Sequence, residues 1–329
     1  MRDLSIQEYE KEKALDLCEI HNLAFKSCID KLGTLYGYEN LNSNDIESWI
    51  KDTNSKIWIA YDKDFPIGYI HCSLAKETND NEILTLWFVE TLEGLGQSKI
   101  AVIPSFRNKG AATALINYAL EYYRDLGAEL TCAVAYNTNE SAINLLSTLG
   151  FEHKKKFYYD RYSKIEPFGV DAVIAKYDLI QDLPQINVNP EVLIREIKGD
   201  DLPALKQIFG ECSPYAFGEN PTMEQIFDWV KGDWGEVTLV AEYKNIVVGC
   251  MEYTTLGRIG IPGVLKKYRE RGIGSTLLYY LLRSMKERGK PMAISDSGYV
   301  DLTKQARSMY KRFGFDTSQE LWFWIKKLK

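Results

Sequence analysis

Histidine is the scarcest reactive side chain in this sequence of 329 residues. Only three are present, His21, His71 and His153, and all of them lie in the first half of the chain. The second half therefore has no imidazole that could act as a base or as a metal ligand, which excludes Ser-His-Asp chemistry from that half.

The six cysteines are too scattered to form a familiar site. They lie mostly within apolar segments, and no two of them form a C-x-x-C pair. This pattern is typical of reduced, buried thiols in a cytoplasmic protein, and it argues against a disulfide framework or a zinc site. We therefore expect a cytoplasmic protein without a metal cofactor.

Long basic runs and long apolar runs are missing as well. The net charge is −6 and no basic block stands out, which argues against nucleic acid as the main partner. The apolar run Leu277 to Leu282 is soon interrupted by Arg283 and Lys286, so it is too short to span a bilayer. Residues 1–8 are charged and lack the apolar core of a signal peptide. The sequence predicts a soluble, intracellular protein with neither nucleic acid nor a membrane as its partner.

The length and the pattern of the chain favour two domains of middling size. Strand and helix patterns alternate in the centre of each half but begin with a hairpin-like meander, which predicts α/β domains with a central mixed sheet flanked by helices. Residues 181–190, which are rich in proline and amide side chains, are predicted to be the linker. The expected domains are residues 1–182 and 190–329.

The turn Arg269-Glu270-Arg271-Gly272-Ile273-Gly274-Ser275 lies between a predicted strand, Ile259 to Val264, and an apolar helix. Its two glycines let the backbone approach a ligand, and the helix start offers unpaired N–H groups and the positive end of the helix dipole. Its two arginines add charge and hydrogen-bond donors. The stretch therefore predicts a phosphate-binding turn.

The same signals occur twice. Arg107-x-x-Gly110-x-Ala112 matches Arg269-x-x-Gly272-x-Gly274, with 162 residues from Gly110 to Gly272. Leu149-Gly150-Phe151 matches Phe313-Gly314-Phe315, with 164 residues from Gly150 to Gly314. Two signals that keep nearly the same spacing across the chain indicate an internal duplication.

Both halves resemble the GNAT superfamily of N-acetyltransferases. A strand that leads into [R/Q]-x-x-G-x-[G/A] at a helix start, with A-x-x-x-Y-x-x-x-G-F further along, is the signature of that family. The second half carries both marks, ending in Ala306-x-x-x-Tyr310-x-x-x-Gly314-Phe315. The first half carries the turn and then Ala142-x-x-x-Leu146-x-x-x-Gly150-Phe151. The resemblance implies a tandem of two GNAT domains.

The resemblance also implies that acetyl-CoA is the co-substrate and that the turns bind its pyrophosphate through backbone N–H groups. In the second half the expected contacts are Val264, Arg269, Glu270, Arg271, Gly272, Ile273, Gly274, Ser275 and Thr303. The matching positions of the first half are Val102, Arg107, Asn108, Lys109, Gly110, Ala111, Ala112 and Asn139. A backbone N–H near Val264 would polarise the thioester carbonyl. For Thr303 and Asn139, a role at a helix N-terminus is the alternative.

Tyr310 stands at the family's tyrosine position, where the phenol would protonate the departing CoA thiolate. Its alternative role is packing on an amphipathic helix. The first half has Leu146 at this position, which cannot donate a proton, so we expect the first domain to be catalytically degenerate. Glu252 and Asp296 are the candidates for the base that deprotonates the amine, although each could instead be a solvated or capping carboxylate.

The expected reaction is transfer of an acetyl group to an amine of an unidentified small molecule or peptide, by direct attack in a ternary complex. The alternative is a CoA-binding sensor or scaffold without turnover. In both cases we expect the two halves to pack on each other in a monomer or a homodimer.

Overall fold

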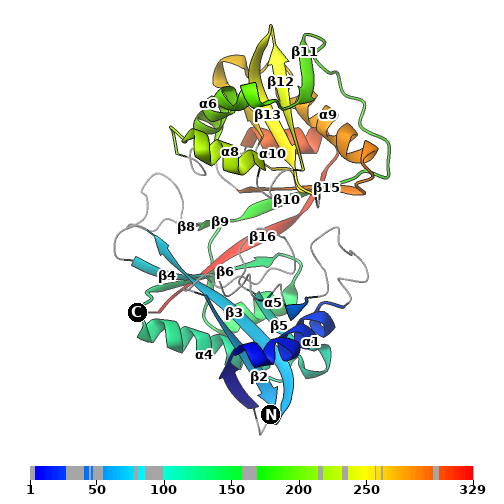
Figure 1. Ribbon diagram of the computed structural model, residues 1–329. Coiled ribbons are helices and arrows are strands. Elements are labelled where there is room, and N and C mark those ends of the chain that lie inside the picture. Colours follow the sequence, from blue (N-terminus) through cyan, green and yellow to red (C-terminus); the bar gives the residue numbers. More distant parts are fainter. Residues whose placement is uncertain are drawn as a thin grey trace. The chain divides into compact units, whose positions relative to one another are not determined.

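The structure is a computed structural model in which the chain divides into two compact units. Unit 1 consists of Met1–Asp171 together with Glu320–Lys329, and unit 2 consists of Ala172–Gln319 (Figure 1). The residues that the structure describes are 4–26, 41–43, 46, 55–77, 81–85, 99–157, 169–213, 218–231, 236–255, 257–260, 262–298 and 304–328.

Unit 1 is built around a mixed sheet. Its elements are β1 (Leu4–Glu8), α1 (Ala14–Ala24), β2 (Ser55–Asp62), β3 (Phe65–Glu77), β4 (Asn81–Thr85), β5 (Lys99–Val102), α4 (Ala111–Asp125), β6 (Leu130–Tyr136), α5 (Glu140–Thr148), β7 (Glu152–His153), β8 (Lys156–Phe157) and β9 (Gly169–Val170), and it receives most of β16 (Asp316–Lys327).

The strands of unit 1 follow the order β1-β2-β3-β4-β6-β16, and β5 extends the pairing on β3 beyond β4. The pairing of β4 with β6 is parallel, whereas β1 to β3 form an antiparallel meander. Helix α4 packs on β2 and β3, and α1 packs on β3 and β5. The apolar core between these layers includes Trp58, Leu115 and Leu146.

Unit 2 repeats this plan. Its elements are β10 (Ala172–Asp178), β11 (Val192–Glu196), α6 (Leu202–Cys212), α8 (Met223–Lys231), β12 (Val237–Tyr243), β13 (Ile246–Tyr253), β14 (Gly263–Val264), α9 (Ile273–Glu287), β15 (Met292–Gly298) and α10 (Lys304–Arg312). Within the predicted strand Ile259 to Val264, the described residues form a strand at Gly263–Val264 and an isolated bridge at Ile259, and Ile261 lies outside the described residues.

Helices cover both faces of the antiparallel sheet β11-β12-β13-β14 in unit 2. Along β12, Leu239 and Ala241 belong to the same apolar cluster as Leu277 of α9, whereas Val240 clusters with Leu205 of α6. Side chains of a strand alternate between its two faces, so α9 and α6 lie on opposite sides of the sheet. Figure 1 shows β12 and β13 running between these helices.

One glycine at the same place in each sheet allows two strands to approach. A Cβ atom added to Gly68 of β3 would lie 2.8 Å from the carbonyl oxygen of Ala101, and one added to Gly249 of β13 would lie 2.9 Å from that of Gly263. Contacts this short force the backbone to shift, so both positions require glycine. The duplication therefore extends to strand packing that the sequence analysis did not identify.

The compact units differ from the expected boundaries because the two halves exchange their last strands. Strand β10, within the predicted first domain, pairs antiparallel with β15 and completes unit 2. Residues 321–327 of β16, at the end of the predicted second domain, pair antiparallel with β6 and complete unit 1. The linker therefore separates the halves along the sequence but does not separate the two cores.

None of the helices among the described residues combines the length and the apolar character needed to cross a bilayer. Among the same residues, no group of three or more His, Cys, Asp and Glu side chains comes together in a way that could hold a metal ion.

Because each unit needs a strand from the other half of the sequence, fragments 1–182 and 190–329 should not fold separately. The first fragment lacks the buried side chains Phe323, Trp324 and Ile325, and both fragments expose an unpaired strand edge. We expect each fragment alone to aggregate or to lose its strand signal by circular dichroism, and the co-expressed fragments to co-purify in equal amounts. Two monomeric, folded fragments would contradict the strand exchange.

Candidate functional site

The turn before α9 has a left-handed backbone at two positions. Glu270 has φ +64° and Gly272, the N-cap residue of α9, has φ +75°. The matching residues before α4, Asn108 and Gly110, have φ +59° and +89°. Neither helix start receives a hydrogen bond from a capping side chain. The first N–H groups of each helix are therefore left to a ligand or to water.

The first arginine of each turn binds the backbone. Arg269 is half-buried, and its Nε donates to the carbonyl oxygen of Val264 at 2.8 Å. Arg107 does the same with Val102 at 3.0 Å, and its Nη2 also donates to the carbonyl oxygen of Ala24 at 2.8 Å. These arginines tie each turn to the preceding strand, which is a structural role that the sequence analysis had not assigned to them.

Asn189, near the end of the predicted linker, forms hydrogen bonds with the turn of unit 2 and with the first turn of α9. The Asn189 side chain donates to the carbonyl oxygen of Arg271 at 2.8 Å, and its backbone N–H donates to Thr276 Oγ1 at 2.9 Å. Thr276 Oγ1 in turn donates to the carbonyl oxygen of Gly272 at 3.0 Å. Two carbonyl groups of the turn are thereby held by hydrogen bonds, while the N–H groups at the start of α9 are left uncapped.

Beside this turn, two neighbouring strand segments separate. The backbone N–H of Ile259 donates to the carbonyl oxygen of Ile294 at 2.7 Å, and Arg258 and Ile294 form a parallel bridge. Further along, β14 pairs with β13, and β15 pairs with β10. The segments therefore diverge and leave an opening between them.

The backbone of Val264 faces this opening. The N–H of the next residue, Leu265, donates to the carbonyl oxygen of Val248 on β13 at 2.9 Å. Successive N–H groups of a strand point to opposite sides, so the N–H of Val264 points away from β13. This is the position from which an N–H group could bind an acyl oxygen.

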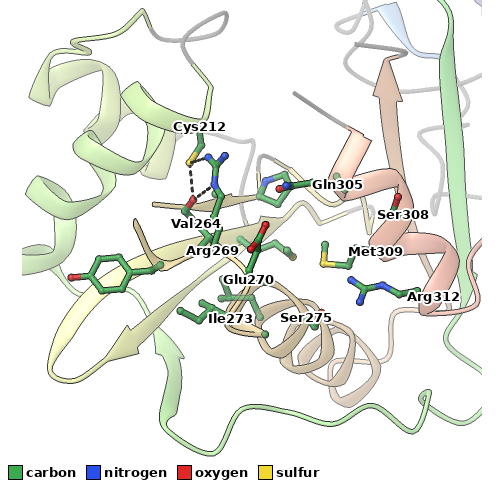
Figure 2. A pocket seen from close by; sticks show the side chains of 18 of the residues that line it. Cys212, Val264, Arg269, Glu270, Ile273, Ser275, Gln305, Ser308, Met309 and Arg312 are labelled. Atoms are coloured by element: carbon green, nitrogen blue, oxygen red, sulfur yellow. Dashed lines mark hydrogen bonds between the residues drawn. The ribbon is translucent and has the colours of Figure 1, made fainter. Parts of the chain in front are cut away.

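A cavity of about 870 Å³ joins the turn to the opening. Its lining includes Cys212, Met251, Pro262, Gly263, Val264, Tyr268, Arg269, Glu270, Gly272, Ile273, Gly274, Ser275, Leu277, Lys304, Gln305, Ala306, Ser308, Met309 and Arg312. Three of these residues are basic and one is acidic. Figure 2 shows the start of α9 on one side and Ser308, Met309 and Arg312 of α10 on the other. The cavity therefore has the polarity that a diphosphate requires.

Most of the predicted contacts of unit 2 line this cavity, but Arg271 does not. Its guanidinium lies over the ring of Tyr243, 5.9 Å from the centroid. Thr303 lies outside the described residues. Lys304, Ser308 and Arg312 were not predicted from the sequence. Their spacing of four residues, which places side chains on one face of a helix, was a signal that could have indicated them.

Tyr310 is buried behind the cavity wall, with 1% of its surface exposed. Its hydroxyl oxygen accepts a hydrogen bond of 3.0 Å from Ser295 Oγ, and its ring packs on Phe315. Ser295 directly follows Ile294, which makes the parallel bridge to Arg258 before the two segments separate. The phenol therefore lies near the point at which the opening between the strands begins.

Glu252 is also buried, and it lies next to the diverging segment. Its Oε1 accepts a hydrogen bond of 2.7 Å from Trp229 Nε1 on α8. A Cβ atom added to Gly260 would meet the same oxygen at 2.4 Å, so this carboxylate lies against the backbone just before the opening. Asp296 belongs to β15, where it pairs with Ile174, but its side chain is outside the described residues.

The matching positions of unit 1 carry a different set of side chains. Asn139 caps α5, since its Oδ1 accepts from the N–H of Ala142 at 3.0 Å. Lys109 Nζ donates to the carbonyl oxygen of Ser105 at 2.8 Å. Leu146, at the position of Tyr310, is fully buried in the core. Counted back from the Gly-Phe pair, the matches of Lys304 and Arg312 are Glu140 and Thr148.

Helix α6 brings Cys212 to the cavity. The Cys212 thiol lies 3.4 Å from the carbonyl oxygen of Val264, to which it donates, and 3.5 Å from Arg269 Nη2 (Figure 2). Burial raises the pKa of this thiol, and the hydrogen bond from Arg269 offsets only part of that effect. Cys212 is therefore a protonated donor to the strand rather than a thiolate nucleophile.

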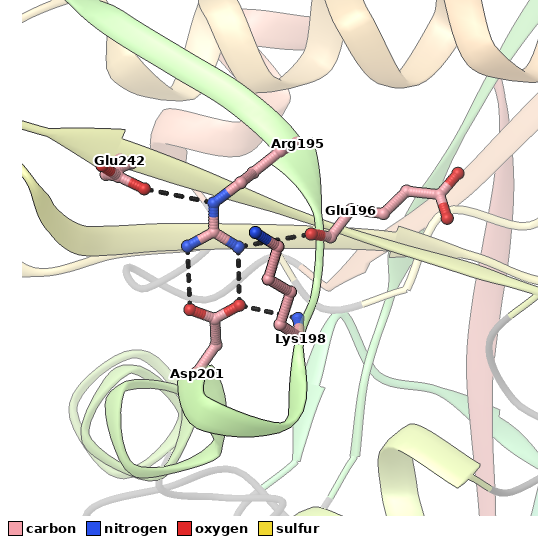
Figure 3. Close-up of polar contacts among 5 residues, drawn as sticks. All are labelled: Arg195, Glu196, Lys198, Asp201 and Glu242. Atoms are coloured by element: carbon pink, nitrogen blue, oxygen red, sulfur yellow. Dashed lines mark hydrogen bonds and ion pairs between the residues drawn. The ribbon is translucent and has the colours of Figure 1, made fainter.

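An ion pair fixes the other end of α6. Arg195 of β11 donates to both carboxylate oxygens of Asp201, at 2.7 and 2.9 Å, and its Nε donates to Glu242 at 3.1 Å (Figure 3). Asp201 also accepts from the backbone N–H of Lys198 at 2.7 Å. The hydrogen bonds from Arg195 hold the pKa of Asp201 below its usual value. This contact sets the start of the helix whose last residue is Cys212.

The sequence profile of the acetyltransferase (GNAT) family matches residues 16–151 and again residues 202–315. An uncharacterised N-acetyltransferase of Methanocaldococcus jannaschii is 32% identical over 90 residues, which are 27% of this chain and 36% of that protein. The chain thus spans about a third of the length of this curated relative.

Two solved structures are similar over nearly the whole chain. A GCN5-related N-acetyltransferase from Sphaerobacter thermophilus has a TM-score of 0.62 at 17% identity, covering 99% of this chain and 96% of that one. A tandem GNAT protein from the clavulanic acid biosynthesis pathway has a TM-score of 0.66 at 11% identity, covering 99% of both chains. At these identities the likeness shows the fold alone, and it confirms the predicted tandem of α/β domains.

Replacing Glu270 by Asn, the residue at the matching position in unit 1, should tighten binding of CoA severalfold. The left-handed backbone favours Asn over Glu by up to about 1 kcal/mol, and the substitution removes the one acidic side chain from the lining. Calorimetric titration measures the affinity for CoA, and thermal unfolding measures the change in stability. The reverse change, Asn108→Glu, is the matched control and should lower stability without altering the affinity of unit 2. Weaker binding by Glu270→Asn would contradict this account of the turn.

Replacing Asp201 by Asn should lower the unfolding free energy of unit 2 by about 1–2 kcal/mol at neutral pH. Because folding lowers the pKa of Asp201, its contribution is present above the unfolded pKa of about 3.9 and is lost as the pH falls through the folded value. The difference between wild type and Asp201→Asn should therefore shrink below about pH 4. Urea unfolding at several pH values measures this difference in unfolding free energy. Hydrogen exchange of the β11 amides identifies the transition that belongs to unit 2. A difference that grows on acidification would refute the ion pair.

Proposed function

This chain belongs to the acetyltransferase (GNAT) family, a family of acyltransferases, and we propose that it transfers an acetyl group from acetyl-CoA to an amine. The profile match in both halves confirms the predicted family and, at that level, the predicted acyltransferase class. The proposed acceptor is an amine of a small molecule or peptide, which attacks directly within a ternary complex. The observation that carries the proposal is the cavity between the start of α9 and the diverging strands of unit 2.

The cavity suits acetyl-CoA at both of its ends. The uncapped N–H groups at the start of α9, together with Lys304 and Arg312, would bind the pyrophosphate. The opening between β14 and β15 is lined by backbone groups that the pantetheine arm could pair with, and the N–H of Val264 would bind the thioester oxygen. Acetyl-CoA supplies the activated acyl group, and the residues of the cavity fix its orientation.

Two buried groups would handle the protons. Glu252 would accept the proton of the attacking amine through water, with Trp229 holding one of its oxygens at 2.7 Å. Asp296 is the second candidate for this base. Tyr310 would donate a proton to the CoA sulfur as the C–S bond breaks. These roles assign the chemistry to unit 2.

Unit 1 would be the degenerate partner. It keeps the turn geometry, but Leu146 replaces the phenol, and Glu140 and Thr148 replace Lys304 and Arg312, the two basic residues of α10 that line the cavity. Helix α5, which matches α10, therefore has no basic residue, so the predicted contacts Val102 and Arg107 to Ala112 lack the cations that α10 supplies in unit 2. CoA should bind unit 2 in preference to unit 1.

The proposal is tested by thiol release from acetyl-CoA with a panel of amines: an aliphatic polyamine, an aromatic ethylamine and a lysine-containing peptide. Replacing Tyr310 by Phe should lower kcat by roughly 10²-fold or more, while CoA affinity changes little, because only the general acid is lost. Tyr253→Phe is the matched control, since Tyr253 is equally buried and its hydroxyl bonds Ser284 within the same unit.

The outcomes separate the two candidate functions. Equal activity of Tyr310→Phe and Tyr253→Phe would exclude Tyr310 as the acid. Tight CoA binding without thiol release across the whole panel would instead favour the CoA-binding sensor or scaffold.

A further inference from the structure

We propose that Ser295 is a positioning residue that directs the phenolic proton of Tyr310 toward the sulfur of CoA. This inference rests on the proposed function, because it concerns the proton that the departing thiolate needs. It adds a residue whose role the family motif does not specify, since Ser295 lies on β15 and outside both sequence marks.

The geometry of the pair supports the assignment. Ser295 Oγ donates to the phenolic oxygen of Tyr310 at 3.0 Å, and the two residues are 3% and 1% exposed. A phenol has one proton to donate, and an oxygen that already accepts a hydrogen bond must turn that proton elsewhere. In a buried site such a bond is stronger and less easily replaced by water. Ser295 thereby restricts the directions in which Tyr310 can donate.

The position of Ser295 determines where that proton can go. Ser295 directly follows Ile294, which makes the parallel bridge to Arg258 before the two segments separate, and on its other side Ser295 pairs with Ala175 of β10. It is therefore held by a paired strand at the start of the opening. With the pyrophosphate at the start of α9, which lines the cavity, the pantetheine arm would extend along β14 and bring its reactive end toward this place.

The duplication provides an internal comparison. In unit 1 the last parallel pair of β4 and β6 among the described residues is Thr85 with Cys132, and the next residue is Ala133. Ala133 therefore matches Ser295, as Leu146 matches Tyr310, and both are fully buried in the core of unit 1. The fold accepts an apolar pair at these two positions. The two hydroxyl groups occur together only in the unit that has the cationic α10, which favours a chemical role over a packing role.

The proton balance of the step is simple. The N–C bond forms as the C–S bond breaks, the amine proton passes to the base, and the phenolic proton of Tyr310 passes to sulfur to give the CoA thiol. The phenolate that remains keeps the hydrogen bond from Ser295, which stabilises its charge. It regains a proton from the protonated base through water, so no other reactant is consumed.

The experiment compares Ser295→Ala, Tyr310→Phe and the double variant, with Ser284→Ala as the matched control. Ser284 Oγ lies 3.1 Å from the hydroxyl of Tyr253, so the control also removes a Ser–Tyr hydrogen bond from unit 2. Two quantities are measured: kcat and KM for thiol release from acetyl-CoA, and the pKa of the bound CoA thiol from the ultraviolet absorbance of its thiolate.

Ser295→Ala should lower kcat roughly tenfold at unchanged KM for acetyl-CoA, because the donor remains but is no longer aligned. It should also raise the pKa of the bound CoA thiol, since the aligned phenol stabilises the thiolate. Neither quantity should change further when Ser295→Ala is added to Tyr310→Phe, and Ser284→Ala should change neither.

Three results would overturn the proposal: equal effects of Ser295→Ala and Ser284→Ala, a full additional loss of activity in the double variant, or a thiol pKa that does not respond to Ser295. If the wild type binds CoA but releases no thiol, the transferase function fails alone, and the thiol titration still decides the role of Ser295. If CoA does not bind, both proposals are refuted.

Discussion

The candidate site depends on two strand segments that pair once and then separate. A strand that loses its neighbour on one side exposes backbone N–H and C=O groups that need new partners. In unit 2 the carbonyl of Val264 is bound by Arg269, while its N–H faces the opening. The helix start at Gly272 lines the same cavity as Val264, so backbone donors are available at two places in one cavity.

The two units share the backbone of the turn and differ in the side chains around it. Both turns have the same pair of left-handed residues, and both begin with an arginine bound to the preceding strand. The differences lie on the neighbouring helix and strand, where unit 2 has Ser295, Tyr310 and Arg312 and unit 1 has apolar or uncharged residues. Both copies of the duplicated unit thus keep the turn and its supporting arginine, but only one copy has the hydroxyl groups and the cation beside it.

The sequence was sufficient for features that depend on neighbouring residues. The turn, the helix start and the repeat of both were predicted, and the family and the tandem fold are confirmed. Features that depend on distant contacts were not predicted. The alternation in β16 is the same whichever sheet it joins, so its pairing with β6 could not be inferred. Likewise, the hydrogen bond from Arg269 to the carbonyl oxygen of Val264 depends on the three-dimensional position of that carbonyl, so it could not be predicted from the sequence.

A matching turn is weaker evidence for a ligand than its sequence suggests, because the turn is stable without one. Arg107 has hydrogen bonds to Val102 and Ala24, and the left-handed glycine is needed to lead a strand into a helix whether or not a phosphate is present. Ligand binding needs charge outside the turn, and turnover needs a proton donor. Ligand binding and turnover in unit 2 would therefore depend on Arg312 and Tyr310, which lie outside the turn, more than on the glycines of the turn.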